Sequence, residues 1–225
     1  MAECYKQQVN DRRRHLAGGK DFAAENLRQH ARRMSKTPYT MTKTQNRVAG
    51  TVSSSCRPKD IADIQIRDEL RCGDLGRIIT LHGVAYQPLS GFGLSFEAYV
   101  AKTIAEYVLD NSSRGRVWLA ERDKELVGCV AIAEREQSTG QLRWVLVDPA
   151  MRGVGLGHRL VTLALDHCVE RGLASVYLET TDGLPESMQL YEKLGFEVLS
   201  TETADLWDGA RKLIKMKLQL SRASV

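Results

Sequence analysis

The feature that most constrains the fold is a run of alternating glycines, RGVGLG, at residues 152–157. It follows an apolar stretch that is typical of a strand, and it precedes HRLVTLALDHCVERG, whose apolar residues recur at helical spacing. Glycine lets backbone N–H groups come close to an anion, and the first turn of a helix leaves four such groups without partners. The segment therefore predicts a strand, an anion-binding glycine loop and a helix.

The glycine spacing separates three kinds of loop. A dinucleotide fingerprint, GxGxxG, fits Gly153 and Gly155, but the third glycine comes one residue early, at Gly157, and His158 stands in its place. A P-loop would end in GK[ST], which this segment does not. The pattern Arg-x-x-Gly-x-Gly fits fully from Arg152 onward. The loop therefore either binds a pyrophosphate or is a glycine-rich turn with a structural role.

Hydrophobic periodicity predicts the other elements of the chain. The expected segments are strands at 62–70, 116–122, 126–135, 141–147, 175–180, 196–200 and 211–220, and helices at 73–87, 94–110, 158–172 and 185–195. Asp74 and Ser95 are the expected N-caps of the first two helices, and Gly172 is placed to end the third. The order βααβββαβαββ indicates an α/β (α+β) fold, a mixed sheet with helices on it.

Charge divides the chain near residue 60. Residues 1–60 carry 13 lysines and arginines against five acidic residues and lack hydrophobic periodicity, whereas the remainder carries 19 against 23. We expect a basic, disordered extension over 1–60 and a compact domain over 61–221. The extension is a solvated tail, a segment that binds nucleic acid or an acidic partner, or an artefact of the assigned start, since Met34 and Met41 also offer starts.

The sequence also bears on the cellular environment. No stretch of about 18 apolar residues occurs, so we expect no membrane span, and the N-terminus lacks the apolar core of a secretory signal. The five cysteines are scattered without a CxxC pair, which argues against a disulfide framework and a zinc site. We therefore expect a cytoplasmic protein without a metal, with Cys129 and Cys168 as small buried side chains.

One combination of motifs resembles a known family. The segment VLVDPAMRGVGLG is followed by a helix, a strand and, about 35 residues later, LYEKLGF, as in the GNAT superfamily of N-acetyltransferases. The likeness covers roughly residues 62–220 and is greatest to the acetyltransferase half of bacterial MarR-type fusion proteins, although no winged-helix pattern precedes it here. The resemblance implies a GNAT fold, with a mostly antiparallel sheet splayed at the acetyl-CoA site and helices on both faces.

The resemblance implies acetyl-CoA as co-substrate and assigns residues to it. The pantetheine arm would pair with the free edge of the strand at Val145, Leu146 and Val147, where a backbone N–H would polarise the thioester carbonyl. The resemblance further implies a direct attack on the acetyl group by a primary amine of a small molecule or protein, within a ternary complex. The residues implied for the pyrophosphate are Arg152, Gly153, Val154, Gly155, Leu156 and Gly157, with His158 beside them.

Two residues are implied for the chemistry. Tyr191, in LYEKLGF, has the position of the family's tyrosine that donates a proton or a hydrogen bond to the departing thiolate, which a phenol with a pKa near 10 can do. Its alternative role is to pack its ring on the helix. Many relatives have a glutamate on the strand before the loop, where this chain has Arg143 and Trp144. Glu179, on the next strand, is the substitute base or else a solvated strand end, and Leu184 replaces an asparagine that contacts pantetheine in the family.

The acceptor side has three candidate residues. Arg143 either binds a substrate carboxylate or is a surface arginine, and His82 and Tyr86 either line the acceptor pocket or pack within their helix. A homodimer through the C-terminal strands is an alternative to a monomer. Two other functions remain open: a non-catalytic acyl-CoA-binding module, which the missing glutamate favours, and a nucleic-acid-binding protein that uses residues 1–60.

Overall fold

The computed structural model describes residues 60–110, 115–136, 138–207 and 209–220. Nearly all of the predicted basic extension lies outside the described residues. The observed order of helices and strands confirms the predicted βααβββαβαββ. The elements are the 3-10 helix η1 (Ile61–Asp63), β1 (Gln65–Arg67), α3 (Asp74–Ser90), α4 (Leu94–Leu109), β2 (Arg116–Arg122), β3 (Glu125–Arg135), β4 (Thr139–Val147), the 3-10 helix η2 (Pro149–Met151), α5 (Leu156–Glu170), β5 (Ser175–Thr181), α6 (Pro185–Lys193), β6 (Glu197–Leu206) and β7 (Gly209–Gln219).

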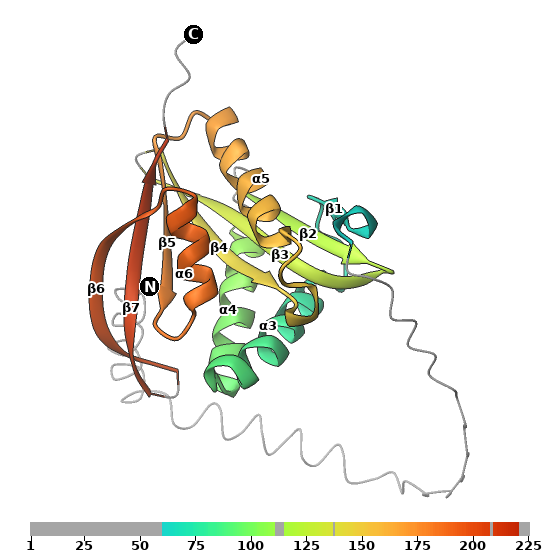
Figure 1. Cartoon of the computed structure of the whole chain (residues 1–225), viewed down its shortest axis with the longest axis horizontal. Helices are drawn as coiled ribbons and strands as arrows, with labels where there is room; N and C mark the ends of the chain where they lie inside the picture. Colours follow the sequence, from blue (N-terminus) through green and yellow to red (C-terminus); the bar gives the residue numbers. More distant parts are fainter. Residues whose placement is uncertain (1–59, 111–114, 137, 208, 221–225) are drawn as a thin grey trace, which may run out of the picture. The chain divides into compact units, whose positions relative to one another are not determined.

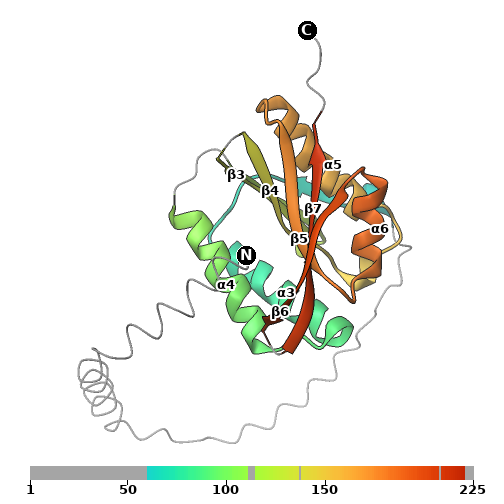
Figure 2. The same ribbon diagram turned by 90° about the vertical axis from the view of Figure 1, so that its left-hand side faces the viewer.

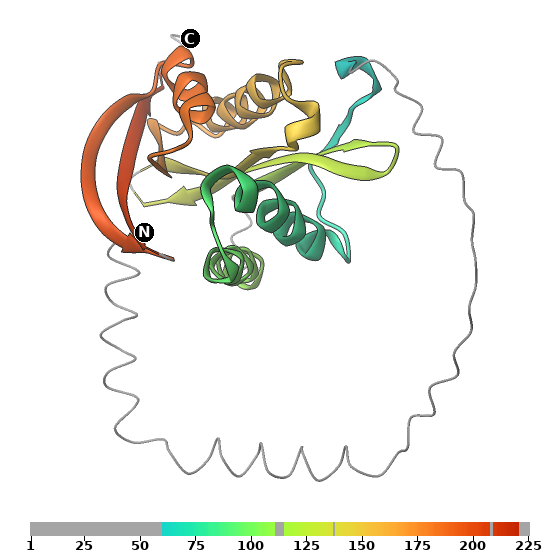
Figure 3. The ribbon, with the colours of Figure 1, turned by 60° about the horizontal axis from the view of Figure 1, so that its bottom comes forward.

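Seven strands form one sheet in the order β1-β2-β3-β4-β5-β7-β6 (Figure 1). Strands β4 and β5 pair in parallel, and the other neighbours in the described sheet pair antiparallel. Helices α3 and α4 lie against one face of the sheet, and α5 and α6 lie against the other (Figure 3). The predicted mixed, mostly antiparallel sheet with helices on both faces is thus confirmed.

The sheet separates two hydrophobic cores. On the α5 side, Leu160, Val161 and Ala164 are fully buried against the sheet, as their helical spacing predicts. Strand β3 is buried on both faces and supplies side chains to both cores, which explains its continuous apolar sequence. Cys129 and Cys168 are both buried, as predicted.

Strands β4 and β5 pair over only three residues each. Thr139, Gly140 and Gln141 align with Ser175, Val176 and Tyr177, and beyond this junction the two strands diverge. A Cβ on Gly140 would lie 3.2 Å from Cys168 Sγ and from Leu173 Cδ1, so the junction is closely packed. The predicted splay is confirmed, and one edge of β4, from residue 142 to 147, has no partner among the described strands.

A bulge interrupts β4 next to this free edge. Cys129 of β3 aligns with Leu146, but Ala131 aligns with Arg143, so β4 carries an extra residue between these two pairs. Trp144 takes a left-handed φ of 48° there, and its carbonyl oxygen accepts a hydrogen bond from Cys129 Sγ at 3.1 Å. The bulge directs Trp144 and Leu146 into the α3–α4 core and turns Val145 toward the α5 core.

The start of the domain differs from the prediction. The expected strand at 62–70 is reduced to the three residues of β1, because η1 occupies its beginning. Gly73 and Gly93, rather than Asp74 and Ser95, are the N-caps of α3 and α4. Helix α3 also continues through Pro88 to Ser90, beyond its predicted end at residue 87.

Asp74 instead lies at the centre of a buried ion-pair network. Its carboxylate accepts hydrogen bonds from Arg67 at 2.7 and 2.8 Å, from the backbone N–H of Arg71 at 2.7 Å and from Arg77 at 3.3 Å, and Glu121 pairs with Arg67 and Arg77. Burial raises the pKa of Asp74, but the bonds from Arg67 and Arg71 outweigh it, and the net pKa is lowered. The network ties β1, α3 and β2 together.

Candidate active site

The glycine loop has the geometry that its sequence predicts. Gly153 and Gly155 have left-handed φ values of 85° and 82°, which glycine adopts without the strain that other residues incur. Gly155 is the N-cap of α5 and provides no side-chain cap, so no capping side chain satisfies the first-turn N–H groups of the helix. These groups and the positive end of the helix dipole form a site for an anion.

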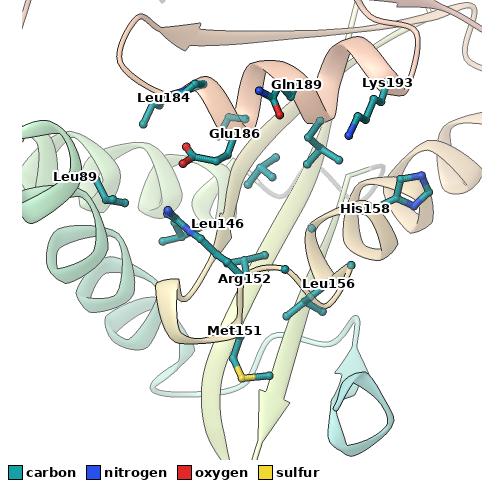
Figure 4. Close-up of a pocket in the computed structure, with 18 of the residues that line it drawn as sticks. Leu89, Leu146, Met151, Arg152, Leu156, His158, Leu184, Glu186, Gln189 and Lys193 are labelled. Atoms are coloured by element: carbon teal, nitrogen blue, oxygen red, sulfur yellow. The ribbon is translucent and has the colours of Figure 1, made fainter. Parts of the chain in front are cut away.

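A cavity of about 610 Å³ lies between the free edge of β4, the glycine loop and α6 (Figure 4). Ten of the thirteen residues predicted for acetyl-CoA or acceptor binding line it. Val154, His82 and Arg143 do not. The lining residues are Tyr86, Leu89, Val145, Leu146, Val147, Met151, Arg152, Gly153, Gly155, Leu156, Gly157, His158, Gly183, Leu184, Pro185, Glu186, Ser187, Gln189, Leu190 and Lys193.

The cavity wall is more basic than acidic. Arg152, His158 and Lys193 contribute basic side chains, and Glu186 is the single carboxylate in the described lining. Arg152 extends from the glycine loop into the space below α6, whereas His158 and Lys193 lie at the other end of the cavity (Figure 4). His158 Nδ1 lies 3.4 Å from Thr162 Oγ1, one turn along α5. The lining therefore suits a long ligand with negative charges toward the α5 end.

Helix α6 supplies residues that the sequence analysis did not select. Glu186, Gln189, Leu190 and Lys193 recur at intervals of three and four residues, so they share the helix face that lines the cavity. This spacing was visible in the sequence and could have identified them. Leu184 also lines the cavity, at the position where the resemblance implies a pantetheine-contacting asparagine.

Tyr191 lies behind the cavity wall. Its side chain is buried, its ring packs edge-on against Phe196 with centroids 5.9 Å apart, and it is not one of the lining residues. Burial raises its pKa, and the neighbouring phenol of Tyr86 raises it further. The hydroxyl therefore keeps its proton throughout the physiological range, and the two phenols are close enough to influence each other.

Tyr86 of α3 is part of the cavity wall. Its ring packs on Phe92 and Phe96, with centroids 5.6 and 5.2 Å away, and burial raises its pKa to about 12. The nearby positive charge of Arg152 partly opposes this rise. Tyr86 thus both packs against its neighbouring aromatic rings and lines the cavity, and its role in an acceptor pocket stays a prediction.

His82, by contrast, is packed inside the α3–α4 pair. It is buried, its Nδ1 lies 2.8 Å from the carbonyl oxygen of Ile78, and its ring neighbours are Tyr86 and Phe96. Burial lowers its pKa to about 4, so the imidazole is neutral and donates to that carbonyl. These contacts correspond to helix packing, the alternative given for this residue.

Arg143 and Glu179 lie on the sheet face that is turned away from α5 and α6. Their strand neighbours Leu142 and Leu178 point into the α5 core, and side chains alternate along a strand. Arg143 Nη2 donates to Tyr99 Oη at 3.4 Å, and its guanidinium stacks on Trp144 at 4.9 Å. Both are half-buried, and both lie outside the cavity lining.

The tip of the β6–β7 hairpin borders the same region. Trp207 packs on Phe92 and Phe96 with centroid distances of 4.8 Å and on Tyr99 at 5.8 Å. Arg211 donates to the carbonyl of Ser90 at 2.8 Å. The tip therefore lies beside α3 and α4, as Figure 2 also shows.

Two kinds of feature are absent from the described residues. No group of three or more His, Cys, Asp or Glu side chains there could hold a metal ion. Within those same ranges, no helix is long and apolar enough to cross a membrane.

Comparison with known proteins identifies relatives of this architecture. Residues 81–196 match the model of the acetyltransferase (GNAT) family. The chain is 40% identical over 83 residues to the uncharacterized N-acetyltransferase YjgM of Escherichia coli, covering 36% of this chain and 50% of that one. It is 38% identical over 80 residues to the mycothiol acetyltransferase of Thermomonospora curvata, covering 36% and 27%. The matches thus span half or less of these curated relatives.

Solved structures share the fold. The ribosomal-protein-S18-alanine N-acetyltransferase from Escherichia coli aligns with a TM-score of 0.55 and 23% identity, over 72% of this chain and 96% of that one. The putative acetyltransferase yncA from Salmonella typhimurium, solved with its cofactor acetyl-CoA, aligns with a TM-score of 0.54 and 20% identity, over 72% and 97%.

Proposed function

Because the chain belongs to the acetyltransferase (GNAT) family, we propose that it transfers the acetyl group of acetyl-CoA to a primary amine of a small molecule or a protein. The observation that carries this proposal is the cavity in the fork between β4 and β5. One wall is an edge of β4 that no described strand pairs with, and the other is a glycine loop at a helix N-terminus.

The residues of the cavity fit acetyl-CoA. The first-turn N–H groups of α5 would bind the pyrophosphate, with His158 beside it. The guanidinium of Arg152 would turn from its place at the other end of the cavity to join them. The free edge at Val145 and Val147 would pair with the amides of the pantetheine arm, as a strand pairs with an added peptide. When bound, acetyl-CoA supplies the activated thioester, and a backbone N–H of β4 would stabilise negative charge on its oxygen.

We propose Tyr191 as the donor of a proton or hydrogen bond to the departing thiolate. Its raised pKa keeps the hydroxyl protonated, which favours the donation of a hydrogen bond over the transfer of the proton itself. Its position behind the lining means that it would act at the deep end of the cavity, next to Tyr86. Glu179 is the proposed base for the amine, through water, because it lies on the acceptor-facing side of β5.

A first experiment measures acetyl-CoA binding by calorimetry in the wild type, Arg152→Ala and Gly155→Asp. Micromolar binding that both substitutions weaken supports the pyrophosphate loop, and a wild type that does not bind acetyl-CoA contradicts the proposed function. A screen of amines for thiol release, with Tyr191→Phe as a variant of reduced turnover, then tests catalysis.

The second candidate function is a non-catalytic acyl-CoA-binding module. It is favoured by the arginine and tryptophan that stand on β4 where many relatives have a glutamate. It predicts the same binding result, but no thiol release with any amine in the screen.

Four further proposals rest on the sequence alone. They are the closer kinship to the acetyltransferase half of MarR-type fusion proteins, a cytoplasmic location, a homodimer through the C-terminal strands, and a basic extension that precedes the compact domain 61–221. A nucleic-acid-binding role would require salt-sensitive binding that is lost when residues 1–60 are removed.

A further inference from the structure

The guanidinium of Arg143 is half-buried and lacks an anionic partner within the described ranges. Its contacts are the hydroxyl of Tyr99 at 3.4 Å and the ring of Trp144 at 4.9 Å, both uncharged. An arginine is rarely withdrawn from water without a carboxylate or phosphate partner, because losing hydration costs the charged group free energy. The aromatic contacts orient the guanidinium and leave donors for an anion.

Other basic groups on this sheet face are engaged differently. Arg135 donates to the side-chain oxygen of Gln141 at 3.0 and 2.8 Å. Lys215 lies over the ring of Tyr177, 4.6 Å from its centroid. Glu179 is the carboxylate that shares the face on β5. Arg143 is thus distinguished by its half-buried guanidinium, whose direct contacts are uncharged, and by its place on β4.

That place is next to the proposed site of transfer. Arg143 is two residues before Val145, roughly 7 Å along a strand, and Val145 lines the cavity. The bulge at Trp144 separates them, so Arg143 faces the α4 side while Val145 faces the α5 core. An acceptor that enters from the α4 side would therefore pass Arg143 immediately before its amine reaches the fork.

On the basis of the proposed acetyl transfer, we infer that the acceptor is an amine that carries a carboxylate only a few bonds from its nitrogen, as amino acids do, and that Arg143 binds this carboxylate. The planar guanidinium matches a carboxylate with two parallel hydrogen bonds. A single guanidinium whose direct contacts are uncharged suits a singly charged anion. Tyr99 and Trp144 hold the guanidinium in position for it.

The test compares each of several amino acids with its own carboxamide, which keeps the amine and removes the charge. The measurement is kcat/KM for thiol release with acetyl-CoA, at a pH where the rate no longer rises as the amine deprotonates. The acid-to-amide ratio is determined in the wild type and in Arg143→Gln. Dividing the two ratios cancels the intrinsic difference between the two amines.

We expect this quotient to be at least about 10, which is typical of a charge-assisted hydrogen bond to a buried group. Arg135→Gln is the matched control, since it removes the same charge from the same sheet face and should leave the ratio unchanged. Equal use of acids and amides by the wild type, turnover of no acid in the panel, or a quotient near 1 would each overturn the inference.

Acetyl-CoA calorimetry on the same preparations distinguishes a failure of the carboxylate inference from a failure of the proposed acetyltransferase function. If the wild type binds acetyl-CoA and acetylates amides without preferring acids, the carboxylate inference fails and the acetyltransferase proposal stands. If acetyl-CoA does not bind, the proposed function fails first.

Discussion

Substitution by alanine should have opposite effects on stability at two glycines of the loop, Gly155 and Gly157. Gly157 is the second residue of α5, and a Cβ there would lie 3.4 Å from Leu190 Cδ2 and 3.7 Å from Val147 Cγ2, in ordinary contact. Gly157→Ala should therefore stabilise the fold by about 0.5 kcal/mol, the lower end for alanine over glycine in a helix. This corresponds to a rise in Tm of roughly 1–2 °C for a domain of this size.

The same methyl group should weaken acetyl-CoA binding. Leu190 and Val147 both line the cavity, so the added carbon occupies space between the glycine loop and α6. Forcing one extra carbon into a filled site costs about 1–3 kcal/mol, which is a loss of affinity of about 5- to 150-fold. Gly157→Ala is thus expected to be more stable than the wild type and a poorer binder.

Gly155→Ala is the matched comparison. Nothing lies within 4 Å of its Cβ position, so only the φ of 82° opposes a side chain, at about 1–2 kcal/mol. Its Tm should fall by roughly 2–8 °C. Thermal unfolding and acetyl-CoA calorimetry on the three proteins decide the matter. If Gly157→Ala binds acetyl-CoA as tightly as the wild type, the ligand does not pass between the loop and α6, and the assignment of the cavity is refuted.

Three further predictions concern stability and reactivity. Asp74→Ala should lower the free energy of unfolding, measured in urea at pH 7, by about 3 kcal/mol, because it removes one partner of a buried ion pair. The control is Glu69→Ala, which should change this free energy by less than about 0.5 kcal/mol, because the side chain of Glu69 is 75% exposed. The difference between Asp74→Ala and the wild type should shrink as the pH falls below about 4, where the unfolded chain takes up a proton that the folded carboxylate refuses. Burial lowers the pKa of His82 to about 4, so between pH 6.5 and 4 only the unfolded chain takes up a proton on this residue. The free energy of unfolding of the wild type should therefore fall by up to about 3 kcal/mol over this pH range. Urea titrations should show a smaller fall for His82→Gln. Iodoacetamide should modify exposed Cys72 in the folded protein and spare Cys129, whose pKa burial raises to about 12, as peptide mass spectrometry can show.

The sequence predicted the elements that local patterns determine. The glycine loop, the helix after it and the order of strands and helices all follow from residue spacing, and the structure confirms them. The resemblance to a family supplied the splay between β4 and β5, which no local pattern at Gln141 or Tyr177 signals. The caps of α3 and α4 were missed because a glycine lies one residue before Asp74 and two residues before Ser95, and each helix begins directly after that glycine.

Side-chain direction was harder to predict than secondary structure. Tyr191 and Lys193 belong to the same motif, yet the first is buried behind the wall and the second lines the cavity, because two residues on a helix differ by about 200° in direction. His82 and Tyr86 are one turn apart and both contact the α3–α4 core, but only Tyr86 reaches the cavity. Depth within a packed pair of helices depends on tertiary contacts that one sequence does not display.

The short junction between β4 and β5 divides the sheet into two parts that diverge from a common line. One part is β1–β4 and the other is β5–β7–β6. The junction between them is three residue pairs long, and Gly140 at its centre packs against Cys168 and Leu173. A ligand that forms hydrogen bonds with the facing edges of β4 and β5 would act as an extra strand and fix the angle between the two parts of the sheet. The thermal stability of the β5–β7–β6 part of the sheet would then depend on the concentration of that ligand.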